Sequence, residues 1–551
     1  MGMNRYGIGV FLTSVAALCG CSSNNPSQNA YAALCSSFTS TARLVSITPA
    51  TGPEFGDQQV TAVLKDFDPG ADPAVYLGNK ARGVSVTSLS ADSVSMSFTT
   101  AGSPTPGACP LVVVNSLRAC AYLANAYTYR PPVSSAFKTF VAMGASYTAG
   151  FQSDSYNEDA QLNGPATWIA RQAGAYFPIP LIKMPGLPPE EGLEGLNTNG
   201  VFQISLAAIA GALFTITDMP PFFEDPTVKP YNIAIPGAEI EDEVLGPASK
   251  TLYASIAIPL SNFLFAPYDN SFSETKDIKP EIVMAKELHP TIIVSTDLYG
   301  NDLVTGYVTP YSDFVLYLTQ AVSALASTGA QVFLADVPHA FDIPSFQQTA
   351  LEDLTPCGMT FYDVPIRQID QAASPVDNCA ATFTAGTCAY RACESFVPMD
   401  RSIDKFNSEF ASVVAPYRNV HIVHFADLAA GKTTLAGQGT SFDAEGFPQY
   451  VLSNGVKLKM KHLGGFYSLD DIHLTNAGYA VLASVFIQTI NDTLGTDVPL
   501  PDLVSIVAQD PLSPPALSNY CSQGANSQKV FCQCVDGAIG ATTLTCSTIF
   551  Y

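Results

Sequence analysis

The chain has 551 residues, of which 47% are hydrophobic and 13% are charged. This apolar content excludes disorder as the main state, and 39 Gly with 40 Pro exclude a coiled coil. Asp and Glu outnumber Lys and Arg by 48 to 25, so the formal net charge is −23. Because so acidic a surface repels phosphate, the composition argues against nucleic acid as a partner.

The first twenty residues have the pattern of an export signal. A positive charge precedes an apolar run, residues 7–18, which is shorter than the roughly 20 residues that span a bilayer. The run ends in Leu18-Cys19-Gly20-Cys21, which resembles a bacterial lipobox. The resemblance implies that residues 1–20 are removed and that Cys21 becomes a lipidated amino terminus; a plain signal peptide is the alternative. A lipid anchor implies a membrane partner in the bacterial cell envelope, and Ser22 after Cys21 resembles the outer-membrane sorting pattern.

Export implies an oxidising compartment, in which cysteines form disulfides. Setting aside Cys19 and Cys21 leaves 11 of the 13 cysteines. Two clusters of four, within residues 357–393 and 521–546, fit two disulfides each, although sequence does not fix their pairing. No His lies inside a cluster, so zinc is disfavoured and we expect no metal. The remaining cluster is odd in number: Cys35, Cys109 and Cys120.

The composition changes along the amino-terminal quarter of the chain. Residues 21–40 are rich in Ser, Asn and Ala and are expected to form a tether. Residues 41–131 hold short alternating runs between Gly, Pro and Asp turns, which is typical of an all-β domain. Residues 47–56 (ITPATGPEFG), 75–78 (VYLG) and 127–129 (YTY) resemble an IPT/TIG immunoglobulin-like domain. The resemblance implies a small β-sandwich that serves as a spacer or a protein-binding module.

Residues 135–499 alternate apolar strands with helical stretches, which is typical of an α/β domain with a parallel sheet. Helices are predicted over residues 312–325 and 477–493, and Ser312 is expected to cap the first of them. Residues from about 355 to 395 have little periodicity and are expected to form an insertion tied by disulfides. Residues 500–551 are expected to form a Cys-rich tail. The predicted strands are residues 137–143, 231–235, 291–295, 332–337 and 420–425.

Residues that could take part in catalysis stand at the ends of three of these strands, where ligands of open α/β sheets bind. Ser146 follows the first strand between two glycines, in a turn that can expose a nucleophile. Gly237 and Asn301 follow the second and third strands. Asp470 and His473 are three residues apart and can meet on one face of a turn. A serine nucleophile needs such a base, oriented by a carboxylate. Taken singly, Ser146 also fits a helix cap, and an Asp-x-x-His pair is usually structural.

Together, in this order, the four blocks resemble the SGNH (GDSL) hydrolase family. The resemblance covers residues 135–499 and implies a flavodoxin-like, three-layer α/β/α domain. It also implies Ser146 as nucleophile, His473 as general base and Asp470 as the acid that orients it. The oxyanion hole would consist of the backbone N–H groups of Ser146 and Gly237 and the side-chain amide of Asn301. No cofactor is implied.

Two positions depart from the family pattern. Ala145 replaces the Asp of the usual Gly-Asp-Ser, and Tyr299 stands where a Gly is usual, two residues before the Asn. Asp471 is a weaker candidate for the orienting acid, and His339 lies near a strand end. Residues 202–214 are either a lid over an acyl pocket or a helix of the core.

The sequence therefore predicts an exported, lipid-anchored esterase or lipase that acts on a lipid ester, an acylated glycan or a small ester. The alternative is a non-catalytic surface lipoprotein that uses a hydrolase-like scaffold for adhesion or binding. Acyl transfer to another hydroxyl is a third reading, because it would use the same residues.

Overall fold

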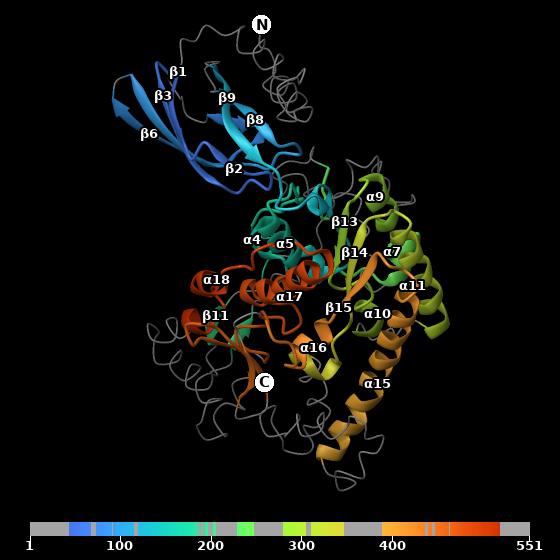
Figure 1. The fold of residues 1–551 in the computed structure, drawn as a ribbon. Coiled ribbons are helices and arrows are strands. Elements are labelled where there is room, and N and C mark those ends of the chain that lie inside the picture. The colour runs from blue at the N-terminus through green and yellow to red at the C-terminus, as the bar shows by residue number, and fades with distance from the viewer. Residues whose placement is uncertain are drawn as a thin grey trace, which may run out of the picture.

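A computed structural model of the chain has an all-β amino-terminal region followed by a larger region of helices around a parallel sheet (Figure 1). At this level the predicted fold class, mixed α and β after an all-β part, agrees with the structure. The described residues are 43–67, 73–90, 92–114, 120–184, 186, 190, 193–196, 202–204, 229–246, 279–304, 310–345, 388–435, 439–443, 447–461 and 463–517.

The all-β region consists of two sheets that share one core. Their strand orders are β1-β3-β7-β6 and β2-β9-β8-β4-β5. In β3 and β7 every second side chain is buried, as expected for strands with one face on a core. Val60 and Met96 of the first sheet and Leu111 of the second lie in one hydrophobic cluster. The strands are β1 (Arg43–Thr48), β2 (Thr51–Pro53), β3 (Gln59–Lys65), β4 (Ala74–Leu77), β5 (Asn79–Lys80), β6 (Arg82–Ser90), β7 (Ser93–Thr99), β8 (Gly107–Val114) and β9 (Cys120–Arg130).

The central sheet of the larger region has four parallel strands in the order β10-β13-β14-β15. The strands are β10 (Phe140–Ala142), β13 (Ile292–Ser295), β14 (Gln331–Ala335) and β15 (Val420–Val423). Residues 231–235 run parallel to β10 at the sheet edge, where Ile233 N–H donates to the carbonyl of Ala142 at 2.8 Å. Numbered along the chain, these five segments lie in the order 2-1-3-4-5. The predicted first strand is too long at its start, because Ser135–Phe137 forms a 3₁₀ turn that Ser134 caps.

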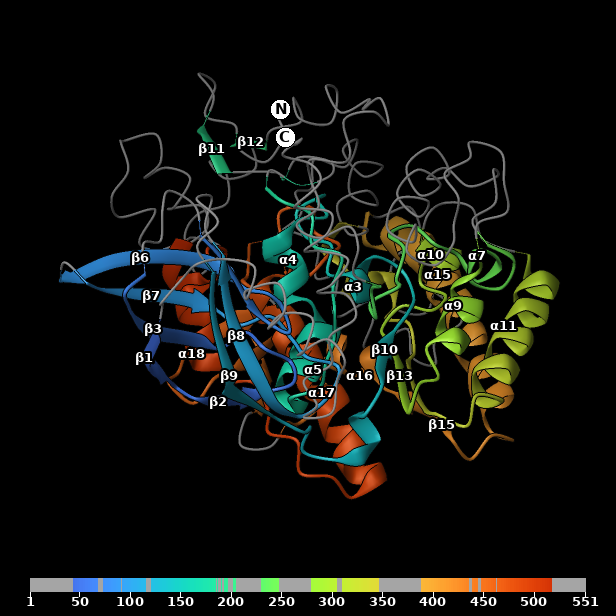
Figure 2. The same cartoon turned by 90° about the horizontal axis from the view of Figure 1, so that it is seen from above.

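Helices cover both faces of this sheet (Figure 2). Alternate strand residues enter two different cores: Phe140 and Ala142 join the core under α5 and α17, while Val141 joins the one under α9 and α11. The pattern follows from the alternation of side chains along a strand, and explains why these strands are apolar throughout. The helices are α3 (Ser146–Ala149), α4 (Glu158–Asn163), α5 (Pro165–Ala173), α7 (Ile240–Leu245), α9 (Glu281–Glu287), α10 (Asn301–Val304), α11 (Tyr311–Ala326), α15 (Cys388–Val414), α16 (Phe425–Ala429), α17 (Asn476–Leu494) and α18 (Leu503–Gln509), with a 3₁₀ turn η5 (Ala340–Asp342).

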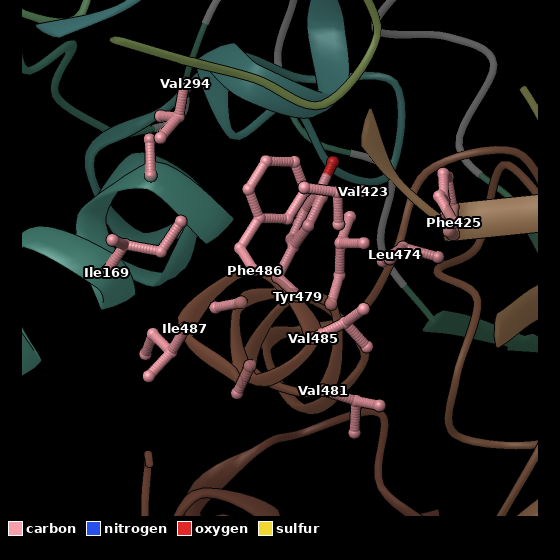
Figure 3. Close-up of a cluster of buried hydrophobic side chains, with 14 of the residues drawn as sticks. Ile169, Val294, Val423, Phe425, Leu474, Tyr479, Val481, Val485, Phe486 and Ile487 are labelled. Atoms are coloured by element: carbon pink, nitrogen blue, oxygen red, sulfur yellow. The ribbon is translucent and has the colours of Figure 1, made fainter. Parts of the chain in front are cut away.

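Helix α17 is the centre of the first core. Its side chains face Ile169 of α5 and Val294 and Val423 of the sheet (Figure 3). Thr475 caps it by accepting from Gly478 N–H at 3.0 Å, and Asp510, after α18, accepts from a further N–H of its first turn at 2.7 Å. These two oxygens satisfy amides that a helix start leaves unpaired.

Two local predictions require correction. Ser312 lies inside α11 and does not cap it, because Pro310 occupies the cap position and its fixed φ suits a helix start. Helix α15 begins at Cys388, so the end of the predicted insertion, residues 355–395, is helical. Two further small sheets are antiparallel, with strand orders β11-β12 and β16-β17-β18. Their strands are β11 (Leu193–Leu196), β12 (Phe202–Ile204), β16 (Gly439–Phe442), β17 (Pro448–Val451) and β18 (Lys457–Lys459).

The all-β region docks on α5. Arg171 of α5 forms an ion pair with Asp57 at 3.1 Å, and Asp57 also pairs with Arg82 of β6 at 3.3 Å. Phe55 N–H donates to the carbonyl of Gly174 at 3.2 Å, just after α5. Side chains and backbone therefore both connect the two regions.

Several predictions fall outside the described residues: the signal and tether with Cys21 and Cys35, most of residues 202–214 and of the insertion, and the cysteines of the tail. Cys109 and Cys120 are described, and both are disulfide-bonded. Among the described residues, no helix has both the length and the apolar character needed to cross a bilayer.

Candidate active site

Ser146 stands at the start of α3, directly after a glycine turn that ends β10. Gly144 has a φ of +131°, and a Cβ there would lie 2.6 Å from Ser295 Oγ. Only glycine tolerates both the conformation and the contact. The tight turn brings the half-buried Ser146 to the carboxyl end of the sheet.

The loop after β13 holds this turn through Asp297, a residue that the sequence reasoning missed. Its buried carboxylate accepts from Ala145 N–H at 3.0 Å, Tyr147 N–H at 2.6 Å and Thr148 Oγ1 at 2.6 Å. Burial raises the pKa of Asp297, although these hydrogen bonds oppose the rise. Ser146 N–H, between the bound amides, has no acceptor among the described residues. The only sequence signal for Asp297 was an acidic residue just beyond a predicted strand.

Asp470 and His473 meet in a turn, as their spacing predicts. His473 Nδ1 lies 2.9 Å from Asp470 Oδ2, and the two side chains are 10% and 3% exposed. Burial alone would raise the pKa of Asp470, but the charge and hydrogen bond of His473 lower it to about 2. Burial opposes protonation of His473, yet the negative charge of Asp470 raises its pKa above the ordinary value. Asp470 therefore stabilises the imidazolium that forms when His473 accepts a proton.

The imidazole of His473 lies against two aromatic residues that follow Ser146 in the chain. Its ring centroid is 5.5 Å from that of Tyr147 and 4.7 Å from that of Phe151. Phe151 N–H donates to the carbonyl of Ser146 at 2.9 Å, and Tyr147 Oη donates to the carbonyl of Ile472. The structure thus brings the predicted nucleophile and the predicted base into one neighbourhood, although they are more than 300 residues apart.

Asp154 is a second carboxylate beside His473, and the sequence reasoning missed it as well. Ser153 and Asp154 both have positive φ, 49° and 53°, and this turn directs Asp154 N–H to Asp470 Oδ2 at 2.8 Å. Asp154, Asp470 and His473 each offer one possible metal-ligand atom, all within 4.8 Å of one another. Because Nδ1 of His473 faces Asp470, a cation bound to that nitrogen would have to displace this hydrogen bond.

The two other predicted oxyanion donors lie side by side. Asn301 Nδ2 donates to the carbonyl of Ala238 at 2.8 Å, which ties the start of α10 to the loop of Gly237. Gly237 has a φ of +86°, and its N–H has no acceptor among the described residues. An amide nitrogen carries two hydrogens, and the bond to Ala238 uses one of them. The loop also connects to the nucleophile turn, because Ile235 N–H donates to the carbonyl of Gly144 at 2.9 Å.

Two buried carboxyl groups lie beneath the turn. Glu281 Oε2, at the start of α9, accepts from Gly144 N–H at 2.9 Å, and Glu243 of α7 is its neighbour. Burial raises the pKa of both groups well above the usual range. The charge of Glu243 raises the pKa of Glu281 further, whereas a hydrogen bond to Glu281 opposes the rise at Glu243. Simultaneous ionisation of the two groups is therefore disfavoured, and we expect the pair beneath the turn to hold at least one proton.

The two departures from the family pattern have structural roles. Ala145 is 1% exposed, and its N–H is one of those that Asp297 binds. Tyr299 is fully buried, and its hydroxyl donates to Asn407 Oδ1 of α15 at 2.8 Å. Neither side chain takes the place of a predicted donor or of the predicted base.

Two weaker candidates have other surroundings. Asp471 is buried with a φ of +58°, and its carbonyl accepts from Ser345 N–H. His339 pairs with Asp404 of α15 at 2.8 Å. The carboxylate that forms the hydrogen bond with His473 Nδ1 is that of Asp470.

Two comparisons, with protein families and with curated proteins, give no match. No protein-family model matches the chain. No curated protein matches it either.

Proposed function

We propose that this chain is an exported serine ester hydrolase of the SGNH type. The observation that carries the proposal is the packing of His473, held by Asp470, against Tyr147 and Phe151, which follow Ser146 in the chain. A histidine held by a buried carboxylate next to a serine at a strand end is the arrangement that activates a hydroxyl.

In the proposed reaction, Ser146 Oγ attacks the ester carbonyl carbon while His473 takes its proton. The tetrahedral intermediate collapses, the C–O bond to the alcohol breaks, and His473 returns the proton to the leaving oxygen. Water, deprotonated by the same imidazole, then attacks the carbonyl carbon of the acyl-enzyme. The bond from that carbon to Ser146 Oγ breaks, His473 returns the proton to Oγ, and the acid leaves. Asp470 stabilises the imidazolium in both steps.

The negative charge that develops on the carbonyl oxygen needs donors that are already in place. Ser146 N–H and Gly237 N–H, which have no acceptor among the described residues, fit this role together with Asn301 Nδ2. Asp297 supports it by binding the neighbouring amides of the turn, Ala145 N–H and Tyr147 N–H. The loss of one such donor typically lowers the rate by about 10²–10³.

The architecture supports the same proposal. A 2-1-3-4-5 order of parallel segments with helices on both faces is the flavodoxin-like arrangement, and ligands bind there at the carboxyl ends of strands. We further propose that the amino-terminal sandwich is an IPT/TIG immunoglobulin-like module. The disulfide-bonded Cys109 and Cys120 support export to an oxidising compartment, where Cys21 would carry the lipid anchor of an envelope protein.

The test is covalent labelling by a fluorophosphonate, which reacts with activated serine hydroxyls and loses fluoride. We expect the parent and a Ser312→Ala variant, which loses an exposed serine of α11, to label equally. The Ser146→Ala variant should not label and should not hydrolyse p-nitrophenyl esters. A series of ester chain lengths would then define the acyl group that the enzyme accepts.

Two outcomes would contradict the proposal. Labelling that persists in Ser146→Ala would mean that another group reacts. A parent protein that unfolds cooperatively on heating but neither labels nor hydrolyses esters would favour the adhesion alternative.

A further inference from the structure

A cleft of about 390 Å³ lies where the all-β region meets the larger region. Its walls come from β5 and β6 of the sandwich on one side and from the end of α4 and residues 176–183 on the other. Small-molecule sites are commonly clefts of roughly 300–1,000 Å³, and domain interfaces are a preferred place for them.

The cleft is basic in a strongly acidic protein. Lys80, Arg82 and Lys183 line it with a single acid, Asp57, although Asp and Glu outnumber Lys and Arg by 48 to 25 in the chain. The Asp57 carboxylate is already shared by two arginines, Arg82 at 3.3 Å and Arg171 at 3.1 Å. Lys80 and Lys183 are exposed, and neither forms an ion pair with another described residue. Two lysines, one from each region, therefore bring positive charge to the cleft without an ion-pair partner among the described residues.

The remaining surface of the cleft is largely apolar and aromatic. Phe55, Tyr176 and Phe177 contribute rings, and Ile179 and Leu181 contribute aliphatic surface. An apolar lining with a few charged groups suits a ligand that has a ring with an apolar face and an anionic substituent. A cleft of this volume suits a small ligand, whereas a long polyanion would be opposed by the net charge of −23 of the whole chain.

We propose that this cleft binds an acidic sugar, carboxylated or phosphorylated, with its anionic group on Lys80 and Lys183 and its ring on the aromatic side chains. The site is separate from the candidate active site. None of the proposed catalytic or oxyanion residues lines the cleft. The proposal therefore does not depend on catalysis.

Isothermal titration of the full chain with digalacturonate, glucose 6-phosphate and maltose tests the proposal. We expect at least one of the two acidic sugars to bind at least tenfold more tightly than neutral maltose, with an affinity that falls as NaCl is raised. Binding of only one would identify the preferred anion. A Lys80→Gln/Lys183→Gln variant should lose at least tenfold in affinity, while a control that removes two exposed lysines elsewhere, Lys138→Gln/Lys432→Gln, should not change.

The proposal is overturned if neither acidic sugar binds at millimolar concentration, or if maltose binds equally well. It is also overturned if both double variants bind like the parent. Thermal unfolding of each variant shows whether a loss of binding is a loss of folding. The Ser146→Ala variant should bind like the parent, because the cleft lies apart from the Ser146 turn.

Discussion

The Asp470→Asn substitution tests the candidate site most directly. Both carboxylate oxygens accept hydrogen bonds: Oδ1 from the N–H groups of Ile472 and His473, and Oδ2 from His473 Nδ1 and Asp154 N–H. An Asn side chain must place its NH₂ group against one of these two sets of donors. Either orientation leaves buried donors unpaired, and the orientation that faces His473 forces the wrong tautomer on the imidazole.

The size of the effect follows from the pKa of Asp470, which is lowered from 3.8 to about 2. A lowered folded-state pKa contributes about 2 kcal/mol to stability at pH 7. This contribution is present above the unfolded pKa, near 4, and is lost as the pH falls towards 2. We therefore expect Asp470→Asn to lower the free energy of unfolding by at least about 2 kcal/mol at pH 7, and the difference from the parent to shrink below pH 4.

Activity should fall much further, because misorientation of the base in a serine triad costs about 10⁴ in rate. The assay is the second-order rate constant for fluorophosphonate labelling, with urea unfolding at pH 7 and pH 3 on the same samples. Asp471→Asn is the matched control, since it changes the adjacent acid and should label within about threefold of the parent. If Asp470→Asn labels within about tenfold of the parent while it remains folded, Asp470 does not orient the base.

Three further predictions concern neighbouring residues. Asp154→Asn removes a negative charge that raises the pKa of His473, so the acidic limb of the pH–rate profile should move to lower pH. An unmoved limb would contradict this role. Gly144→Ala should abolish labelling and cost roughly 2 kcal/mol or more in urea unfolding, because its Cβ would meet buried side chains closer than 3.0 Å. Gly329→Ala, at a φ of +78° with nothing within 4 Å of its Cβ, should cost only about 1–2 kcal/mol and label normally. Burial raises the pKa of Glu54 to about 7, so the folded state keeps a proton that the unfolded state loses above pH 4.5, and stability falls as the pH rises between these values. Glu54→Gln should therefore match the parent near pH 4 and be more stable at pH 8, and equal unfolding curves at pH 8 would show that this burial has no cost.

Local sequence determined the elements and one half of the candidate site. Continuous apolar runs marked strands that are buried on both faces, and periodicity located α17 to within one residue at each end. Asp470 and His473 were predictable as a pair because three residues in a turn bring them together without help from the rest of the chain. Helix starts were less certain: the sequence favoured Ser312 as a cap, but the fixed φ of Pro310 decides where α11 begins.

Tertiary structure decided what supports that pair and the Ser146 turn. The Asp297 carboxylate binds Tyr147 N–H from 150 residues away, and Asp154 N–H reaches Asp470 across 316 residues. Glu281 likewise meets Gly144 across 137 residues. Spacing along the chain carries no information about such contacts, because they depend on which strand ends the sheet order places together and on burial that makes an unpaired polar group costly. The sequence could therefore propose the reacting groups, and only the fold could show which carboxylates hold them.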